Sequence, residues 1–534
     1  MSSFKRKKTR RNHKKKTSEK IVEAMQTDSA GNSKKEVTIK YVLYGLFLIY
    51  LFYYFFNLYT SLDKTFFWAD ENKHAYISSL VLKNHQIPVV LPAEMYGEFQ
   101  WSYPPLFHII GAAVQGLAGF TALKYTNLIL FLVFILFFFI MTYKYYGDTE
   151  AILACLLLSL APVVAVNTIR FTVEMLSMLL TFLSFFFFLL ALRENKTHFA
   201  VFCGLSTALL MLSKQTGFIV LSFYFLLLPW LFWKNKSELK ILLSIIAVSL
   251  GIYLPYFIWA TSHEAGIFSF INLFIGKRPE WALLGAKSFQ RYDSALTEFG
   301  LLYYEGAGFV VTLSILLPLY YFIRTRLKDT PQIYILLLGL YLSAVMVVWH
   351  ITNSRHIITL IPFIVFLFSY SLHQIVTRKR ILQSLCILLL IIAGYSAYRI
   401  PDYRQKYNKS GKEFMPIAKI IKEDNYSSGR ILCANKFDAL MYTQKPVIWP
   451  HPKLNKNPLD LFERQSPENL YSILKSYQIK YVLINVSLVT NTGRFMGRNY
   501  PLFLVRNFEH LERQGKLTLK GISESKKFIL LKVS

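Results

Sequence analysis

Apolar residues fill most of the first 400 positions of this chain in long blocks, and short polar or basic segments separate the blocks. A bilayer core about 30 Å thick is crossed by roughly 20 apolar helical residues. Runs such as residues 128–141 show no alternation of apolar and polar positions, which favours helices over the strands of a barrel. The pattern therefore predicts an all-α polytopic membrane domain.

The blocks predict about eleven transmembrane helices. A further block, residues 106–120, is ambiguous because it is short, contains His108, and follows the turn-forming Tyr103-Pro104-Pro105. The predicted spans are residues 41–60, 121–143, 151–168, 172–192, 199–213, 217–233, 241–260, 301–323, 332–350, 357–376 and 381–398.

The distribution of Lys and Arg resolves the ambiguous block and orients the chain. We place the basic tail, residues 1–40, in the cytoplasm, because cytoplasmic segments carry an excess of cations. If residues 106–120 lie flat as an interfacial helix, the basic loops near Arg193, Lys234, Arg324 and Arg378 also become cytoplasmic. Residues 41–398 then form the membrane domain, with an external loop at 61–120.

Beyond residue 399 the chain becomes polar and mixed. RILCA, YVLINV and KFILLKV have the character of buried strands, and SPENLYSILKSY that of a capped amphipathic helix. Alternating strands and helices predict a C-terminal extracytoplasmic α/β domain over residues 399–534.

The net charge of +29 changes this picture little, because much of it lies in the tail and in short loops. A basic tail beside a membrane also attracts anionic lipid. RNA is the alternative ligand, but the tail lacks aromatic residues that stack on bases, so we expect membrane lipids and no nucleic acid as partners. The four cysteines show neither metal-ligand spacing nor a disulfide framework.

Two acidic positions near the external surface are candidates for chemistry. Asp70-Glu71 follows the first span, where partial desolvation makes a carboxylate more basic and able to accept a hydroxyl proton; helix capping by Asp70 is the alternative. Glu174 lies one turn into a span, near Arg170, where an ion pair within the helix is the alternative. Two carboxylate sites could share a divalent metal, although such ions usually need more oxygen ligands.

Cations at the external surface oppose the charge rule and therefore need a reason. Lys214 and Arg355-His356 occupy such positions, and binding of a lipid phosphate would explain why cations lie there. For Lys214 the alternative is a side chain that extends to the membrane surface. We expect His74 and His108 to be surface or interfacial residues without a ligand role.

Taken in order, these motifs resemble the C-type glycosyltransferases that use polyprenyl-phosphate-linked sugars, above all the protein O-mannosyltransferase and aminoarabinose transferase superfamily. The resemblance rests on Asp70-Glu71, Tyr103-Pro104-Pro105, the Arg170 to Glu174 segment, Gly204 to Lys214, and Arg355-His356 before an Ile-Pro run. It covers nearly the whole chain, although each motif is short.

The resemblance implies inverting transfer of a sugar from a polyprenyl-phosphate carrier to an acceptor hydroxyl outside the cytoplasm. Asp70 would be the general base with Glu71 as support. Lys214 and Arg355, with His356 and Arg170, would bind the lipid phosphate. Glu174 would organise the acceptor or a metal, and Glu98 matches another acidic loop position.

A polytopic transporter or flippase for a lipid-linked glycan is the rival interpretation. It would predict internal repeats and polar residues at mid-membrane, whereas the polar residues here gather at one face. The sugar, the carrier length and the acceptor stay open, with protein, glycolipid and polysaccharide as alternatives. The host membrane also stays open, either a bacterial inner membrane or an endoplasmic reticulum.

Overall fold

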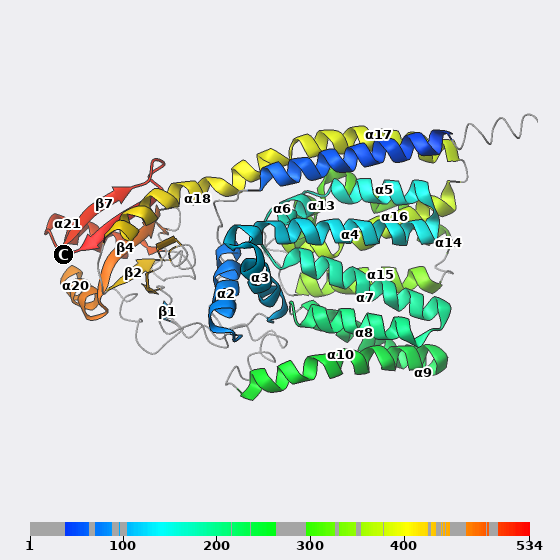
Figure 1. Ribbon diagram of the computed structural model, residues 1–534, viewed down its shortest axis with the longest axis horizontal. Helices are drawn as coiled ribbons and strands as arrows, with labels where there is room; N and C mark the ends of the chain where they lie inside the picture. Colours follow the sequence, from blue (N-terminus) through cyan, green and yellow to red (C-terminus); the bar gives the residue numbers. More distant parts are fainter. Residues whose placement is uncertain are drawn as a thin grey trace, which may run out of the picture.

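The chain folds into a bundle of long helices with a smaller α/β domain at one end (Figure 1). The structure is a computed structural model. It describes residues 38–62, 70–87, 95–96, 104–214, 216–234, 236–262, 295–325, 330–348, 354–376, 379–424, 429–433, 439, 442–443, 445–448, 466–486, 489–490 and 500–534.

Within the described residues, five helices are long and apolar enough to cross a membrane, or up to seven if each of two bent pairs is one span. The predicted all-α membrane domain is therefore confirmed. Each predicted span coincides with a helix or a bent pair, but several of these helices are short, so the total of eleven stays a prediction. The bundle contains a first helix Thr38–Ser61, α4 (Leu123–Tyr146), α5 (Asp148–Ser159), α6 (Pro162–Thr168), α7 (Glu174–Glu194), α8 (Thr197–Met211), α9 (Thr216–Lys234), α10 (Lys236–Ser262), α13 (Ala295–Ser314), α14 (Leu316–Thr325), α15 (Thr330–Val348), α16 (Ile361–Ile375) and α17 (Lys379–Tyr398).

The span predicted at residues 151–168 is broken in the structure. Its halves, α5 and α6, meet at an angle of 72°. Ala161 between them is extended, and Pro162 begins α6, because proline suits the first turn of a helix but not its interior. After the bend, α6 ends at Thr168, and a short turn leads from there to Glu174 at the start of α7.

Two helices cover the end of the bundle that faces the α/β domain (Figure 1). The block whose role was ambiguous forms α3 (Leu106–Ala118), and α2 (Asp70–Asn84) packs against it. Gly111 permits this contact, because a Cβ there would lie 2.3 Å from Ser78 Oγ and 2.8 Å from the Phe171 ring. A short 3-10 helix, η1 (Phe120–Ala122), leads from α3 into α4.

The C-terminal α/β domain is confirmed, and the predicted strands and helix are all present. Its mixed sheet has the order β1-β3-β2-β4-β8-β7. Three pairings among β1 to β4 are parallel, and β8 is antiparallel to both β4 and β7. The elements are α18 (Ile400–Glu423), β1 (Met95–Tyr96), β2 (Arg430–Cys433), β3 (Val447–Ile448), α20 (Pro467–Ser476), β4 (Ile479–Asn485), α21 (Leu502–Arg513), β7 (Leu517–Ile522) and β8 (Phe528–Val533), beside a separate pair β5 (Val489–Thr490) and β6 (Tyr500–Pro501).

Alternating strand residues give this sheet two buried faces. Leu432 and Val482 face a core formed with α20 and α21. Ile431 and Leu483 face the opposite core, which includes α18. The period-2 geometry of strands explains this division, because neighbouring side chains point to opposite faces.

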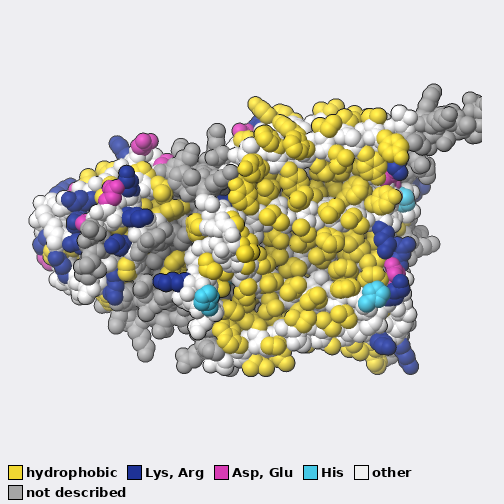
Figure 2. Space-filling model, in the orientation of Figure 1, with side chains coloured by type: hydrophobic (Ala, Val, Ile, Leu, Met, Phe, Trp, Pro, Cys, Tyr) yellow, Lys and Arg dark blue, Asp and Glu magenta, His cyan; other side chains and the backbone are white. Residues whose placement is uncertain are grey.

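Figure 2 shows a broad band of hydrophobic side chains across the visible face of the bundle, with charged side chains along the end away from the α/β domain. At that end Lys40 pairs with Asp148 at 2.7 Å, and Lys144 pairs with Glu194 at 3.4 Å. An apolar belt bounded by charged ends is the surface expected of a protein embedded in a bilayer. The chain is an integral membrane protein.

Candidate functional site

The turn between α6 and α7 is held in place by one buried amide. Asn127 Nδ2 on α4 donates to three backbone carbonyl oxygens, those of Asn167 at 3.0 Å, Arg170 at 2.5 Å and Thr172 at 2.7 Å. Carbonyl groups at a helix end need such partners when water is excluded. The turn is thereby fixed to α4; it carries Arg170 and leads directly into Glu174, the first residue of α7.

Glu71 on α2 fastens this turn to the helix pair α2 and α3. Its Oε1 accepts from Lys124 Nζ at 2.7 Å and from the Phe171 backbone N–H at 2.9 Å, while Arg170 Nε lies 3.7 Å from Oε2. The side chains of Glu71 and Lys124 are only 5% and 2% exposed. Burial alone would raise the pKa of Glu71, but the positive charges of Lys124 and Arg170 and these hydrogen bonds bring it below its usual value.

This arrangement gives Glu71 a structural part in the site. A carboxylate that is buried, ionised and already bound by two donors is a poor acceptor for a substrate proton. Asp70 begins α2 next to it, but the Asp70 side chain lies outside the described part of the structure. Glu98 also lies outside the described residues, so the roles implied for both remain predictions.

A second cluster forms where α7, the α8–α9 turn and a 3-10 helix, η2 (Ser354–Thr359), converge. Glu174 Oε1 lies 3.4 Å from Lys214 Nζ and 3.5 Å from Arg355 Nε. Lys214 Nζ lies 3.4 Å from His356 Nδ1. The structure thus brings together four residues from three distant parts of the sequence, and the cations outnumber the carboxylate. Such a cluster suits a phosphate group.

Arg170 was predicted to belong to this phosphate-binding cluster, but its guanidinium lies on the Glu71 side of the turn. Arg170 connects the two clusters through the backbone, because it precedes Glu174 by four residues on the turn that Asn127 holds (the locked turn). Its predicted contact with lipid phosphate stays a prediction.

Lys214 is held at the end of the bundle by a tight connection. Its N–H donates to the Leu210 carbonyl at 2.8 Å, and the Leu106 N–H at the start of α3 donates to the Leu212 carbonyl at 2.7 Å. A Cβ at Gly217 would lie 2.3 Å from the Met211 nitrogen, so only glycine fits this close approach. Lys214 and the Glu71 cluster therefore share the end of the bundle covered by α2 and α3.

Two histidines expected at the surface are buried between α2 and α3. His74 Nδ1 and His108 Nε2 lie 2.9 Å apart, and their rings stack at 5.1 Å. Both side chains belong to the buried polar residues. The expectation was wrong because α2 and α3 pack on each other, and this contact buries one face of each helix away from the membrane–water interface.

Sequence reasoning also missed Lys124 and Asn127. Both lie in the first turns of a predicted span, at the end predicted to be external, and an ionisable residue such as Lys124 in that position needs a partner. That signal could have identified Lys124 as a candidate. Nothing in the sequence alone indicates that the Asn127 amide reaches three carbonyls.

The site offers little to a metal ion. Among the described residues there is no group of three or more His, Cys, Asp or Glu side chains that could hold one. Both described carboxylates, Glu71 and Glu174, have cationic side chains as neighbours, and these compete with any metal.

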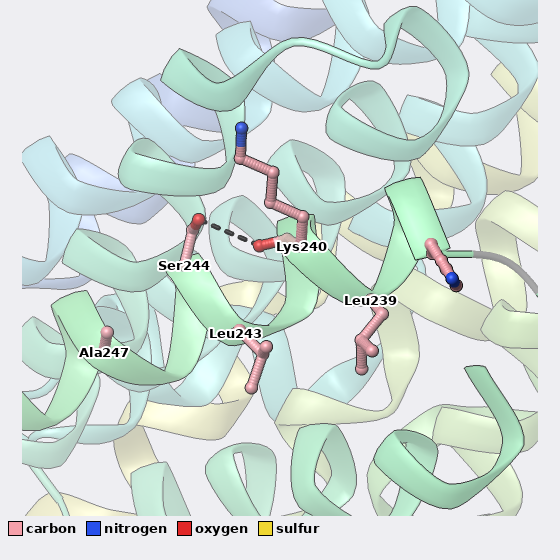
Figure 3. A pocket seen from close by; sticks show the side chains of 6 residues that line it. Leu239, Lys240, Leu243, Ser244 and Ala247 are labelled. Atoms are coloured by element: carbon pink, nitrogen blue, oxygen red, sulfur yellow. Dashed lines mark hydrogen bonds between the residues drawn. The ribbon is translucent and has the colours of Figure 1, made fainter. Parts of the chain in front are cut away.

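A shallow groove of about 390 Å³ lies elsewhere, along α10. In Figure 3, Lys240 and Ser244 line one flank of this helix while Leu239 and Leu243 line the other. Lys240 belongs to the α10 end predicted to be cytoplasmic. None of the predicted site residues lines the groove, so it is separate from the candidate site.

Comparison with known proteins agrees with this architecture. Residues 102–259 match the family described as dolichyl-phosphate-mannose-protein mannosyltransferase. This segment holds Lys124, the locked turn, Glu174 and Lys214. No curated protein sequence matches the chain.

The fold is similar to that of two solved membrane proteins. ArnT from Cupriavidus metallidurans bound to undecaprenyl phosphate has a TM-score of 0.68 and 13% identity, covering 91% of this chain and 98% of that one. The archaeal oligosaccharyltransferase AglB from Archaeoglobus fulgidus, in complex with an inhibitory peptide and a dolichol-phosphate, has a TM-score of 0.60 and 13% identity, covering 84% and 70%. The predicted resemblance to C-type glycosyltransferases is confirmed in the fold.

Proposed function

We propose that this chain is a membrane glycosyltransferase that moves a sugar from a polyprenyl-phosphate carrier to an acceptor hydroxyl on the extracytoplasmic face. The observation that carries the proposal is the cluster of Lys214, Arg355 and His356, at the end of the bundle covered by α2 and α3. Both similar structures hold a polyprenyl phosphate, and the matching family is described by a lipid-phosphate sugar.

The reaction follows from the placement of charge. Asp70 at the start of α2 takes the proton of the acceptor hydroxyl as that oxygen attacks the anomeric carbon of the sugar. The bond from this carbon to the phosphate oxygen breaks, and the electron pair leaves with the polyprenyl phosphate. A single displacement of this kind inverts the anomeric centre. Lys214 and Arg355 stabilise the charge that develops on the departing phosphate.

Glu71 and Glu174 have supporting parts in this scheme. Glu71 fixes α2, and so the Asp70 position, to α4 and the α6–α7 turn. Glu174 lies among the cations and limits their net charge, which allows the phosphate product to leave. No step requires a metal. Whether the sugar is a hexose or a pentose depends on contacts with the donor.

The direct test is transfer by the purified protein in liposomes that contain a labelled polyprenyl-phosphate sugar. We expect Asp70→Asn to lose transfer by at least about a hundredfold, within the range for loss of a general base. Asp402→Asn is the matched control, because Asp402 lies on the domain side of the bundle and is more than half exposed. Wild-type turnover in Asp70→Asn would overturn the base assignment.

The donor and the rival function can be separated in cells. In a strain that lacks this chain, a transferase defect should accumulate the polyprenyl-phosphate sugar, measured by mass spectrometry of the lipids. Normal carrier lipids together with a missing export product would instead support a transporter.

A further inference from the structure

Helix α2 has two faces, and each packs against a different domain. On the first face Glu71, His74 and Ser78 are spaced three and four residues apart, as neighbours on a helix are. Glu71 bonds Lys124, His74 bonds His108, and Ser78 packs against Gly111. This face joins α2 to the membrane domain.

The second face of α2 belongs to the core of the C-terminal domain. Ile77 has 0% exposure and lies in one cluster with Phe414, Ile417 and Ile421 of α18. This cluster continues into the sheet of that domain through Ile431 and neighbouring strand residues. Three further α2 side chains, all partly buried, pack against it: Tyr76, Leu80 and Val81.

The same external loop reaches the domain a second time. Strand β1, Met95–Tyr96, lies only eleven residues beyond the end of α2 and pairs in parallel with β3 at Val447 and Ile448. The loop that contains the predicted base therefore supplies the edge strand of the C-terminal sheet. Two separate attachments fix the position of the loop better than one.

Isolated helices of this length are marginal in water, so the orientation of α2 depends on what packs against it. The polar face supplies the contact with Lys124 and the locked turn. The apolar face packs against the core of the C-terminal domain. Loss of either contact would leave the start of α2 free to shift relative to the Lys214 cluster.

We propose that the C-terminal α/β domain holds α2, and with it Asp70, in the reactive position, and that Ile77 is the positioning residue of this contact. The C-terminal domain thus contributes to catalysis by positioning α2, although the proposed catalytic residues belong to the membrane domain. This inference rests on the proposed function for its kinetic consequence, but the packing role itself can be measured separately.

The test compares truncations in the two cores of one domain. Ile77→Ala shortens the side chain that links α2 to α18. Leu474→Ala shortens an equally buried side chain on α20, in the core on the far face of the sheet, which contains no α2 residue. Ile77→Val keeps most of the side chain and serves as the conservative rescue.

We expect Ile77→Ala to lower kcat by about tenfold to a hundredfold, since small misplacements of catalytic groups have effects of this size. KM for the lipid-linked donor should change by less than about threefold, because the phosphate cluster is untouched. Ile77→Val should stay within about twofold of wild type in kcat. Leu474→Ala should also keep most of its kcat.

Amide hydrogen exchange gives a readout that does not depend on the reaction. Ile77→Ala should increase exchange in α2 while α20 stays protected, and Leu474→Ala should do the reverse. An unchanged kcat and unchanged α2 exchange in Ile77→Ala would overturn the proposal, and so would equal kcat losses in both truncations. If the wild-type protein transfers no sugar, the proposed function fails, and the exchange pattern still decides the role of Ile77.

Discussion

Replacing Glu71 by glutamine tests the ion pair that connects α2 to the membrane domain. Glutamine keeps the shape of the side chain but removes the charge facing Lys124 at 2.7 Å and Arg170 at 3.7 Å. The Lys124 ammonium would then be buried, with its side chain 2% exposed, and without its carboxylate. Breaking a buried pair by removing one partner destabilises by about 3–5 kcal/mol. We expect about 3 kcal/mol for Glu71→Gln, because the glutamine oxygen can still accept one hydrogen bond.

The assay measures the free energy of unfolding in mixed micelles by titration with SDS. Glu194→Gln is the matched control, since Glu194 pairs with Lys144 and Lys196 at the exposed far end of the bundle. We expect a much smaller change there, because exposed pairs are weakened by solvent.

The double variant Glu71→Gln with Lys124→Met separates the two contributions. It removes the buried ammonium that has lost its carboxylate, so it should recover part of the stability lost in Glu71→Gln, and the two changes should be strongly non-additive. A loss below about 1 kcal/mol in Glu71→Gln, or strict additivity in the double variant, would refute the buried-pair reasoning.

The other predictions concern pH and the phosphate cluster. Because the folded pKa of Glu71 is lowered, its stabilising effect is complete above its usual value of 4.5 and is lost as the pH falls through the lowered pKa; the stability gap between wild type and Glu71→Gln should close over that range, and a gap that widens on acidification would contradict the pairing. Lys214→Ala should weaken binding of polyprenyl phosphate by at least about tenfold, as expected for a lost charge-assisted contact; unchanged binding in a lipid-retention assay would remove Lys214 from the phosphate site. Glu174→Gln removes the carboxylate near both Lys214 and Arg355 and should tighten binding of the same lipid by about tenfold while slowing its release; weaker binding would show that Glu174 is needed to position the cations.

The elements of this fold could be predicted because they depend on local patterns. Long apolar blocks can only be spanning or buried helices, and Ser466 before Pro467 marks the start of α20, where its hydroxyl accepts from the Asn469 N–H. The nearly continuous apolar runs of β2 and β4 likewise follow from the geometry of a sheet covered on both faces. Sequence order was also enough to place Glu174, Lys214 and Arg355 at one end of the bundle.

The partners of these residues could not be predicted in the same way. The sequence indicates that Glu71 is costly to bury, but the choice of Lys124 as its counter-ion depends on how α4 packs against α2. The same limit applies to the histidines, because the apolar character of α3 suits an interfacial helix, and only its contact with α2 shows that His108 is buried.

The sequence by itself determined that the chain spans a membrane, that an α/β domain follows, and which charged residues share an end of the bundle. Only the tertiary structure decided that Glu71 bonds a turn a hundred positions away. It also decided that α2 lies between the two domains, with Ile77 in the core of the C-terminal domain. The physical reason is that hydrophobic periodicity is a local property of the chain. The pairing of buried charges and faces depends instead on contacts between distant segments, and many pairings are compatible with one pattern.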